Sequence, residues 1–377
     1  MEYKKSLSGL KVAIVHDWMV GLGGAERVVG SMLKLLPQAD IYTSVYSPDK
    51  LQLFAGHKIN TTFLQNWPLS RSKHQLFSAL RPLAFESLDL SNYDLVLSSS
   101  SAESKGVITP TSTLHISYIH TPTRYYWSGY SDYLAEPGFG VLNPIVRLLM
   151  PSLVRRLRKW DFAAAQRPDY LVANSNVVSA RISEYYNRPS QTIRPPVDTD
   201  RFRNDRENQQ GDYLLVVSRL VPYKRVDLAV KACNKLGLKL IVAGRGPELS
   251  RLKKLAGSTV SFVESPSDSQ ITKLYLGARG FIFSAEEDFG ITPVEAMSAG
   301  LPVICFGEAG ATETVIDGAT GVYHANQTVA SLVEAIGKFE ATKFDRGTIV
   351  KRAKMFSESR FLDELGGYIA DKISKKP

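Results

Sequence analysis

The sequence contains little cysteine. Cys233 and Cys305 are the only two cysteines in 377 residues, and each lies in an apolar stretch. This number excludes the disulfide framework that holds small secreted domains together. The apolar settings favour two buried, unpaired thiols over one disulfide, and unpaired thiols are typical of proteins in a reducing cytoplasm.

Long apolar runs are absent as well. No stretch approaches the roughly 20 apolar residues that a helix needs to span a bilayer. Residues 1–15, MEYKKSLSGLKVAIV, hold no apolar stretch of signal-peptide length before the first predicted strand. We therefore expect a cytoplasmic protein, with peripheral attachment to the inner face of the plasma membrane as the alternative.

Acidic side chains are outnumbered by basic ones. Lys and Arg number 46 against 37 Asp and Glu, which gives a net charge of +9 and a pI of about 9.3. Such an excess favours an anionic partner: a phosphate group, a nucleotide, a nucleic acid or an acidic membrane surface. Because the excess is spread over both halves without a polybasic tail, we expect no nucleic-acid binding.

What the sequence does contain is a regular alternation of short apolar runs with amphipathic segments. The runs are typical of buried parallel strands, and the segments between them, such as residues 24–36, have helical spacing. The alternation predicts an α/β fold with parallel sheets covered by helices on both faces. The predicted strands occupy residues 11–18, 39–46, 93–99, 114–120 and 170–175, and then 213–220, 238–244, 260–263, 280–285 and 302–306.

A polar, proline-marked stretch at residues 194–212 separates the two sets of strands. We place the domain boundary there, with one domain over residues 1–204 and the other over residues 205–356. In sheets of this type, ligands bind beyond the carboxyl ends of the strands. A cleft between the two halves is therefore the expected site.

The motif HDWMVGLGGAERVVG follows the first predicted strand and opens a helix. Gly21, Gly23 and Gly24 would let backbone amides approach a phosphate or a sugar closely. The dinucleotide fingerprint would need a glycine where Glu26 stands, so a nicotinamide dehydrogenase is disfavoured. A tight strand-to-helix turn without a ligand remains an equal alternative.

Two further motifs follow strands of the second half. VSRLVPYKR places Arg219 and Lys224 five residues apart across a proline turn, where a forked guanidinium and a compact ammonium suit a diphosphate. A solvated basic turn would have the same composition. AGRGPE, residues 243–248, either lines the site or only turns the chain.

The motif YIHTPTRYYW ends a predicted strand of the first half. His120 lies at the end of that strand, and Arg124 follows one turn later. A lone histidine is more often structural than functional, but its place at a strand's carboxyl end favours a functional role.

The stretch EEDFGITPVEAM gathers four carboxylates around one glycine. Thr292, Pro293 and Glu295 match a capping box, with threonine at the N-cap, proline at the first helical position and glutamate at the third. A cap explains Glu295 without a ligand. It does not explain Glu287 or Gly290.

Residues 143–165 have the spacing of an amphipathic helix with a basic side that holds Arg155, Arg156, Arg158 and Lys159. A core helix with a solvated basic face accounts for this pattern. A helix on an anionic membrane surface, contacting it through residues 143–160, is the alternative.

Taken together and in this order, the motifs resemble the family 4 glycosyltransferases, retaining enzymes of the GT-B fold that use sugar nucleotides. The resemblance covers nearly the whole chain, and its most specific element is E-x7-E, here Glu287 to Glu295. It implies two Rossmann-like, doubly wound domains facing across a cleft. It also implies that a terminal helix, about residues 357–377, crosses back to the first domain.

The resemblance implies a role for each matching residue. Arg219 and Lys224 would hold the donor diphosphate, Glu287 would accept hydrogen bonds from the transferred sugar, and Glu295 would accept them from the ribose. His120 would lie beside the donor sugar near the reacting carbon. The resemblance also implies donor contacts for Gly23, Gly24, Gly290, Ile291 and Thr292, and acceptor-side places for Asp17 and Arg124.

Two positions depart from the family pattern, since Asp288 and Ser218 stand where glycine is usual. Neither change removes a charged contact, but both alter a loop of the expected site. Asp198 and Asp200 form an Asp-x-Asp pair, which another class of glycosyltransferase uses to hold a metal ion. Here the pair lies beside the predicted linker, and turn chemistry explains it better.

The chain looks most like bacterial mannosyltransferases of surface polysaccharide and lipopolysaccharide synthesis. This similarity implies transfer of mannose from GDP-mannose to a glycan or lipid-linked acceptor, without a metal ion or other cofactor. A UDP-sugar donor is the second choice. A protein that binds sugar nucleotides without catalysis would carry the same donor motifs.

Overall fold

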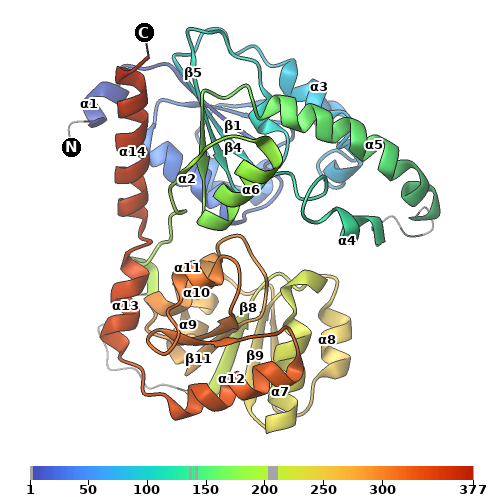
Figure 1. Cartoon of the computed structure of the whole chain (residues 1–377), viewed down its shortest axis with the longest axis vertical. Coiled ribbons are helices and arrows are strands. Elements are labelled where there is room, and N and C mark those ends of the chain that lie inside the picture. Colours follow the sequence, from blue (N-terminus) through green and yellow to red (C-terminus); the bar gives the residue numbers. More distant parts are fainter. Residues whose placement is uncertain (1–2, 136–137, 139, 141–142, 203–210, 377) are drawn as a thin grey trace. The chain divides into compact units, whose positions relative to one another are not determined.

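The computed structural model describes residues 3–135, 138, 140, 143–202 and 211–376. The chain divides into two compact units, Met1–Arg194 with Leu362–Pro377 and Pro195–Phe361. Each unit is built on one parallel β-sheet flanked by helices (Figure 1). The predicted fold class, two Rossmann-like parallel-sheet domains, is confirmed.

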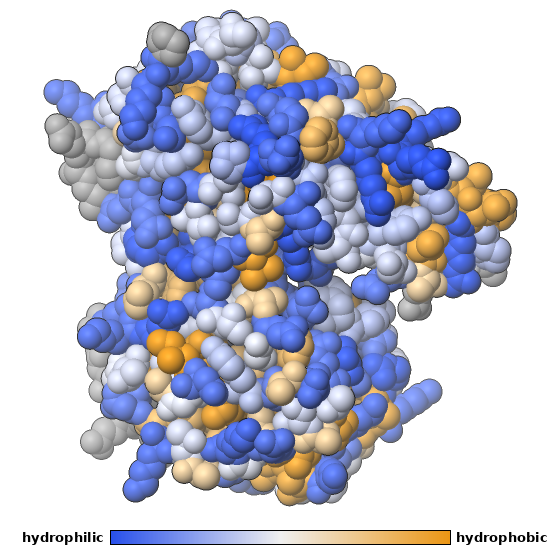
Figure 2. Space-filling view, viewed as in Figure 1, coloured by the Kyte–Doolittle hydropathy of each residue, from blue (hydrophilic) through white to orange (hydrophobic). Residues whose placement is uncertain are grey.

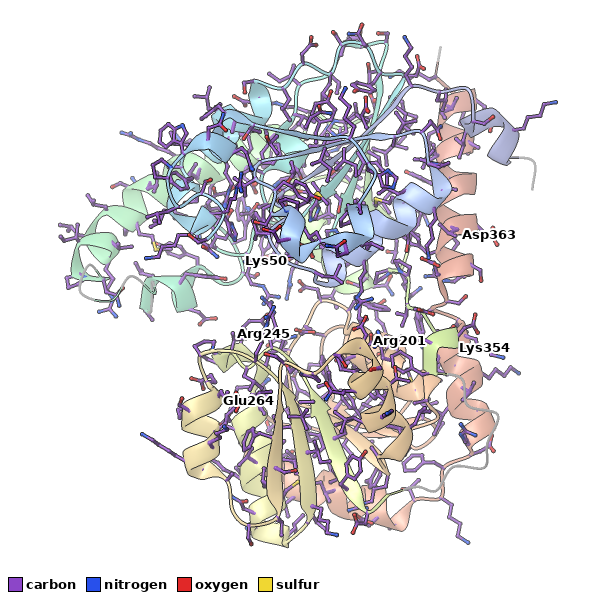
Figure 3. The ribbon with its side chains drawn as sticks, turned by 180° about the vertical axis from the view of Figure 1, so that it is seen from behind. Lys50, Arg201, Arg245, Glu264, Lys354 and Asp363 are labelled. Atoms are coloured by element: carbon purple, nitrogen blue, oxygen red, sulfur yellow. The ribbon has the colours of Figure 1, made fainter. Side chains whose placement is uncertain are left out.

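The division between the units differs from the boundary placed near residue 204. Arg201, labelled in Figure 3, forms an ion pair with Asp268 at 3.4 Å, and the ring of Phe202 packs on Tyr275 with centroids 5.1 Å apart. These contacts place residues 195–202 in the second unit. Helix α14 (Glu358–Ser374) begins in the second unit and continues from Leu362 in the first.

The sheet of the first unit contains seven parallel strands in the order β3-β2-β1-β4-β5-β6-β7. The five strands predicted for this half are all present, and the short strands β3 and β7 extend the two edges. The strands are β1 (Val12–His16), β2 (Asp40–Thr43), β3 (Ile59–Thr61), β4 (Leu95–Ser100), β5 (Leu114–Ile119), β6 (Tyr170–Ala173) and β7 (Gln191–Thr192). The other helices of this unit are α1 (Tyr3–Leu7), α2 (Gly24–Leu35), α3 (Arg81–Glu86), α4 (Tyr130–Ala135), α5 (Asn143–Ala164) and α6 (Asn176–Tyr186).

The sheet of the second unit has six strands in the order β10-β9-β8-β11-β12-β13. The five predicted strands are present, and β13 is the one that the apolar pattern did not predict. The strands are β8 (Tyr213–Val217), β9 (Lys239–Gly244), β10 (Val260–Glu264), β11 (Gly280–Phe283), β12 (Val303–Phe306) and β13 (Gly321–His324). The helices are α7 (Val226–Leu236), α8 (Leu249–Leu255), α9 (Asp268–Gly277), α10 (Ile291–Ser298), α11 (Ala311–Thr314), α12 (Val329–Ala341) and α13 (Arg346–Lys354).

Alternate residues of the central strands enter two different cores in the second unit. Leu215 and Phe281 belong to the cluster on one face of the sheet, whereas Leu214 and Ile282 belong to the cluster on the other face. Because side chains alternate along a strand, a sheet covered on both faces needs apolar residues at every position. This requirement explains the continuous apolar runs that predicted these strands.

The two cysteines lie inside this unit, unpaired and buried, as the sequence predicted. Burial raises the pKa of Cys233 to about 12, so its thiol stays protonated and behaves as a small apolar side chain.

The strand register brings functional candidates together at one edge of the first sheet. His16 ends β1 and is paired in register with Ser99 of the neighbouring β4. Ser99 is in turn paired with Tyr118 of β5, and His120 follows the end of β5 directly. Parallel strands end at the same edge, so these side chains meet although they are far apart in the sequence.

Helix α5 runs to the margin of the first unit (Figure 1). Its later turns pack inward through Val154, Leu157, Asp161 and Ala164, which are buried. Figure 2 shows hydrophobic surface at the right-hand edge of the first unit, where the first turns of α5 lie in Figure 1. Within the described part of the chain, no helix has the length and apolar character needed to cross a membrane.

Candidate active site

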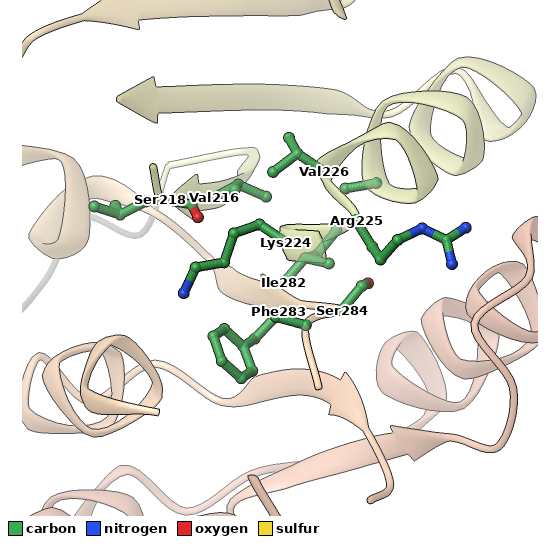
Figure 4. A pocket seen from close by; sticks show the side chains of 11 residues that line it. Val216, Ser218, Lys224, Arg225, Val226, Ile282, Phe283 and Ser284 are labelled. Atoms are coloured by element: carbon green, nitrogen blue, oxygen red, sulfur yellow. The ribbon is translucent and has the colours of Figure 1, made fainter. Parts of the chain in front are cut away.

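Lys224 lies beyond the carboxyl end of β8. A single 3-10 turn, Pro222–Lys224, follows the strand. The backbone N–H of Lys224 donates to the carbonyl of Val221 at 3.1 Å. Arg225 then adopts a left-handed conformation with φ 51° and begins α7. This abrupt change of direction sends the two basic side chains opposite ways, as Figure 4 shows.

The ammonium of Lys224 forms an ion pair with the carboxylate of Glu287. The two side chains are only 14% and 19% exposed. Lys224 also lies over the ring of Phe283, 6.0 Å from its centroid, at the end of β11. A small pocket between β8, β11 and α7 adjoins this lysine and is lined by Val216, Ser218 and Ser284 among others (Figure 4).

Glu287 is held by its backbone as well as by its ion pair. The amide of Gly310 donates to the carbonyl of Glu287 at 2.8 Å. A side chain on Gly310 would meet backbone atoms of Phe289 at 2.4 Å, so only glycine permits this approach. The loop that carries Glu287 is therefore held by the segment that follows β12, a contact that the sequence analysis did not predict.

Arg219 lies in the same turn as Lys224. Its Nη2 donates to the hydroxyl of Tyr223 at 2.9 Å, which holds the guanidinium across the proline turn. Arg245, labelled in Figure 3, follows the neighbouring strand β9 and is exposed. Sequence reasoning quoted the motif that contains Arg245 but did not single it out as a third cation at this edge.

The glycines of AGRGPE have a structural task. Gly244 and Gly246 adopt φ values of 150° and 158°, and a Cβ on them would lie 1.9 Å and 2.2 Å from the carbonyl oxygens of Ser218 and Leu220. The amide of Leu220 donates to the carbonyl of Arg245 at 2.8 Å. The β9 loop is thus pressed against the loop that carries Arg219 and Lys224.

The predicted capping box at Thr292 is wrong. Helix α10 begins at Ile291, and Gly290, with φ 87°, is its N-cap. Thr292 and Pro293 are therefore the second and third helical residues, and no side chain caps the helix. Because Gly290 alone accepts the left-handed conformation without strain, it fixes the start of the helix earlier than the threonine would.

Glu295 consequently lies within the helix and needs another explanation. Its carboxylate accepts a hydrogen bond from the hydroxyl of Tyr275 at 3.2 Å, while that hydroxyl also lies 3.4 Å from the carbonyl of Thr292. Burial and the charge of Glu295 raise the pKa of Tyr275 well above its ordinary value. Glu295 is only partly buried, so its carboxylate can accept further hydrogen bonds.

In the first unit, His120 is linked to Ser99. The hydroxyl of Ser99 lies 2.8 Å from His120 Nε2, and the backbone amide of His120 donates to the carbonyl of Ser100 at 2.8 Å. Withdrawal from water and the neighbouring His16 lower the pKa of His120 to about 3. The ring is therefore neutral at physiological pH.

His16 connects this histidine to the glycine loop. Its Nε2 lies 3.7 Å from Glu26, and the same carboxylate accepts the amide N–H of Gly23 at 2.8 Å. Gly23 is the N-cap of α2 and Gly24 its first residue. Sequence reasoning did not select His16, Glu26 or Ser99. The signals were the histidine that ends the first strand and the glutamate inside the glycine motif.

Asp17 was expected on the acceptor side, but its carboxylate is 1% exposed. Its oxygens accept the backbone amides of Ser101, Ala102 and Ser104 at 2.6, 3.0 and 2.8 Å. These bonds occupy the carboxylate, so we assign Asp17 to holding the loop after β4. Arg124 is partly exposed, and its acceptor-side role stays a prediction.

Thr123 and Trp127 of YIHTPTRYYW belong to a structural network around Asp161. The hydroxyls of Thr123 and Tyr186 and the indole of Trp127 donate to Asp161 at 2.7–2.8 Å, and the ammonium of Lys105 pairs with the same carboxylate at 2.6 Å. Asp161 and Lys105 are buried, so their charges are satisfied by each other and by the neutral groups around them, which include the carbonyl of Ala102.

No group of three or more metal-ligating side chains occurs among the residues that the structure describes. Asp198 accepts the amide of Arg201 at 3.2 Å, a contact typical of a turn.

Two family profiles match consecutive parts of the chain. The profile described as Glycosyltransferase Family 4 matches residues 22–201, and the profile described as Glycosyl transferases group 1 matches residues 198–358. Both halves of the chain, including every predicted site residue except Asp17 and Gly21, lie within these matches.

Curated relatives are distant. A GDP-mannose-dependent alpha-(1-6)-phosphatidylinositol monomannoside mannosyltransferase of Mycolicibacterium smegmatis is 30% identical over 38% of this chain and 45% of its own length. A D-inositol 3-phosphate glycosyltransferase of Mycobacteroides abscessus is 26% identical over 76% of this chain and 74% of its own. The chain thus spans less than half the length of the mannosyltransferase.

Solved structures share the fold. Anabaena HepE in complex with UDP-glucose superimposes with a TM-score of 0.69 at 16% identity, over 96% of this chain and all of that one. Sucrose-phosphate synthase of Thermosynechococcus elongatus gives a TM-score of 0.71 at 16% identity, over 97% of this chain and all of the other. The likeness to these structures shows the GT-B fold. The two profile matches, which together cover residues 22–358, show that the chain belongs to the family 4 glycosyltransferases.

Proposed function

We propose that the protein is a retaining glycosyltransferase that moves mannose from GDP-mannose to a glycan or lipid-linked acceptor in surface polysaccharide or glycolipid synthesis. The observation that carries the proposal is the ion pair of Lys224 with Glu287 beside Arg219, at the carboxyl ends of β8 and β11. This places two cations and a carboxylate where an open α/β sheet binds ligands.

The charge of each site residue indicates which part of the donor it binds. A carboxylate would repel a diphosphate, whereas sugar hydroxyls donate well to it, so Glu287 takes the transferred sugar and Glu295 the ribose. Arg219 and Lys224 take the diphosphate, each through charge-assisted hydrogen bonds. The amides at the start of α10, from Gly290, Ile291 and Thr292, add the positive end of a helix dipole.

The ion pair between Lys224 and Glu287 must open for this arrangement. A diphosphate competes for the ammonium, and the carboxylate is then released to accept a sugar hydroxyl. One exchange of partners thus prepares both residues for a ligand that carries phosphate and sugar together. The departing nucleoside diphosphate is stabilised by the same cations without a metal ion.

We assign His120 to the donor sugar, and Gly23 and Gly24 to close backbone contact with the donor. Retention of configuration proceeds through an oxocarbenium-like state with attack on the face from which the leaving group departs. For this reason we assign no protein nucleophile. We assign Arg124 to the acceptor side of the site.

The names of the relatives support mannose, since one of them is a GDP-mannose-dependent mannosyltransferase. A UDP-sugar is the second donor candidate, because HepE was crystallised with UDP-glucose. A thermal-shift screen of GDP-mannose, UDP-glucose and ADP-glucose distinguishes them. A ligand at 100 times its dissociation constant adds about 2.7 kcal/mol to the free energy of unfolding.

We expect GDP-mannose to raise the melting temperature most. The enzyme is then incubated with this donor and a membrane extract as the source of acceptor, and release of GDP is measured. A donor that binds but never releases its nucleoside diphosphate with any acceptor would identify a non-catalytic binding protein.

We also propose that the protein works in the cytoplasm and attaches peripherally to an anionic membrane through α5. Ile145, Leu148 and Leu149 are 56%, 78% and 61% exposed on its first turns. Arg155 and Lys159 follow Leu148 by seven and eleven residues, which puts them further along the same face. An apolar end followed by exposed cations suits lipid chains and phosphate headgroups.

A further inference from the structure

Four residues of the first unit form a continuous chain of contacts at the carboxyl edge of its sheet. Glu26 lies on α2, His16 ends β1, Ser99 lies on β4, and His120 follows β5. The contacts are 3.7 Å from Glu26 to His16 Nε2, 3.1 Å from His16 Nδ1 to the Ser99 hydroxyl, and 2.8 Å from that hydroxyl to His120 Nε2. His16 and Ser99 are 2% and 0% exposed, so water cannot replace these partners.

The proton positions follow from the donor and acceptor capacities of the groups. His16 Nδ1 also lies 3.0 Å from the backbone carbonyl of Ser99, which can only accept, so this nitrogen carries a proton. His16 Nε2 faces the carboxylate of Glu26, which favours a second proton on the ring. Burial by itself would lower the pKa of His16, but the hydrogen bond and charge of Glu26, together with the charge of Asp17, raise it.

The hydroxyl of Ser99 therefore accepts from His16 and has one proton left to donate. Among the described residues, His120 Nε2 is the acceptor at hydrogen-bond distance from it. If Nε2 carried a hydrogen instead, the serine proton would be buried without an acceptor among the described residues, which is unfavourable. Because His120 is neutral, its single ring proton must then lie on Nδ1.

We infer that Glu26, His16 and Ser99 are positioning residues that hold His120 in the tautomer with its proton on Nδ1, so that Nδ1–H is the one N–H donor of this ring. Glu26 also holds the amide of Gly23, so one carboxylate orients both the histidine and the glycine loop. The consequence for catalysis rests on the function proposed above. The tautomer itself does not.

The tautomer is measured on the full-length protein without substrate, by nitrogen-15 NMR of the imidazole rings. The chain has six histidines, and a His120→Gln variant assigns the signals of His120. We expect a protonated Nδ1 and an unprotonated Nε2 in the wild type. In Ser99→Ala the two tautomers should mix. A protonated Nε2 in the wild type, or an unchanged spectrum in Ser99→Ala, overturns the inference.

Ser98→Ala is the matched control. Ser98 is also fully buried on β4, but its hydroxyl contacts His115 Nε2 at 2.9 Å. This variant should alter the signals of His115 and leave those of His120 unchanged. Ser98→Ala also removes a buried hydroxyl from β4, so a loss of packing alone would affect both variants alike.

The second measurement is steady-state transfer. We expect Ser99→Ala to lower kcat about 10-fold with a smaller change in donor KM, as for one lost hydrogen bond to the reacting geometry, and Ser98→Ala to change kcat less than about 2-fold. A normal kcat in Ser99→Ala with a mixed tautomer would overturn the positioning role. If the protein transfers no sugar at all, the proposed function fails, while the NMR result still decides the tautomer.

Discussion

Lys224 and Glu287 neutralise each other at the carboxyl ends of two neighbouring strands, in a protein that carries a net charge of +9. Both side chains are largely buried, so neither is a surface charge that water would satisfy. A pair of this kind that also borders a pocket is suited to exchange partners with a ligand. The following predictions test that exchange and its surroundings.

Replacing Lys224 with alanine should weaken donor binding roughly 10- to 100-fold, because a hydrogen bond to a charged group contributes about 1.5–3 kcal/mol. Most transfer activity should disappear, since the same ammonium stabilises the departing diphosphate. Binding is measured by calorimetry and transfer by release of nucleoside diphosphate. Lys338→Ala is the control, because that lysine is 61% exposed and pairs with Glu334 on its own helix. Full activity in Lys224→Ala would exclude the proposed diphosphate site.

Glu287→Gln separates the two partners of the ion pair. Glutamine keeps the size of the side chain but no longer neutralises Lys224, so the nucleoside diphosphate alone should bind as tightly as in the wild type or more tightly. Transfer should fall at least about 10-fold, because an amide accepts a sugar hydroxyl less strongly than a carboxylate. Titrations with the diphosphate and with the intact sugar nucleotide check the two effects. Equal weakening of both ligands would contradict the proposed exchange.

Glu295→Ala should weaken donor binding, since the carboxylate is assigned to the ribose and does not cap α10. Tyr275→Phe removes the other end of the contact at 3.2 Å but keeps the carboxylate. It should lower stability by about 1 kcal/mol and leave donor affinity within about 3-fold of the wild type. Melting temperatures and donor titrations distinguish the outcomes. If both variants lose only stability, Glu295 is structural.

These residues also show which parts of the site could be predicted from the sequence. The strands that precede Lys224, Glu287 and His120 could be predicted from apolar runs, because a strand buried on both faces of a sheet is apolar at every position. The start of α10 did not follow, although Thr292 and Glu295 match a capping box. The left-handed backbone of Gly290, packed beside Phe283, sets that start, and no local pattern encodes it.

The other residues that the sequence analysis did not select make contacts with residues far away in the sequence. His16 and Ser99 are 83 residues apart, and Lys105 and Asp161 are 56 residues apart. Each pair meets only because the parallel strands and α5 place them side by side. A single sequence offers no spacing rule for such pairs. The contacts from Glu26 to His120 and the ion pair of Lys105 with Asp161 could therefore be found only in the structure.

The first unit should lose stability in mild acid. Burial lowers the pKa of His115 to about 3, so the folded state keeps this ring neutral while the unfolded chain binds a proton near pH 6.5. Stability therefore falls as pH drops below 6.5, by roughly 2 kcal/mol for this group at pH 5. His120 acts in the same direction. Differential scanning calorimetry at pH 7.5 and pH 5 measures the change. The decrease in melting temperature should be smaller in His115→Gln, and an identical decrease would contradict the assignment.

The face of α5 predicts a specific response to membranes. Vesicles containing anionic lipid should bind the protein at low salt, and Arg155→Glu with Arg156→Glu should reduce binding at least about 10-fold, since each basic residue near such a surface contributes about 1 kcal/mol. Leu148→Ala with Leu149→Ala should remove the part of the binding that persists at high salt, because screening does not weaken apolar contacts.

The matched control is Lys351→Glu with Lys354→Glu on α13, which makes the same change in net charge at two exposed lysines of the second unit. Co-sedimentation with vesicles measures all three variants beside the wild type. If the control loses as much binding as the α5 variant, attraction comes from the total charge and not from α5. If the leucine variant forms fewer dimers in solution and binds vesicles normally, the apolar turns of α5 contact a second copy of the chain instead of lipid.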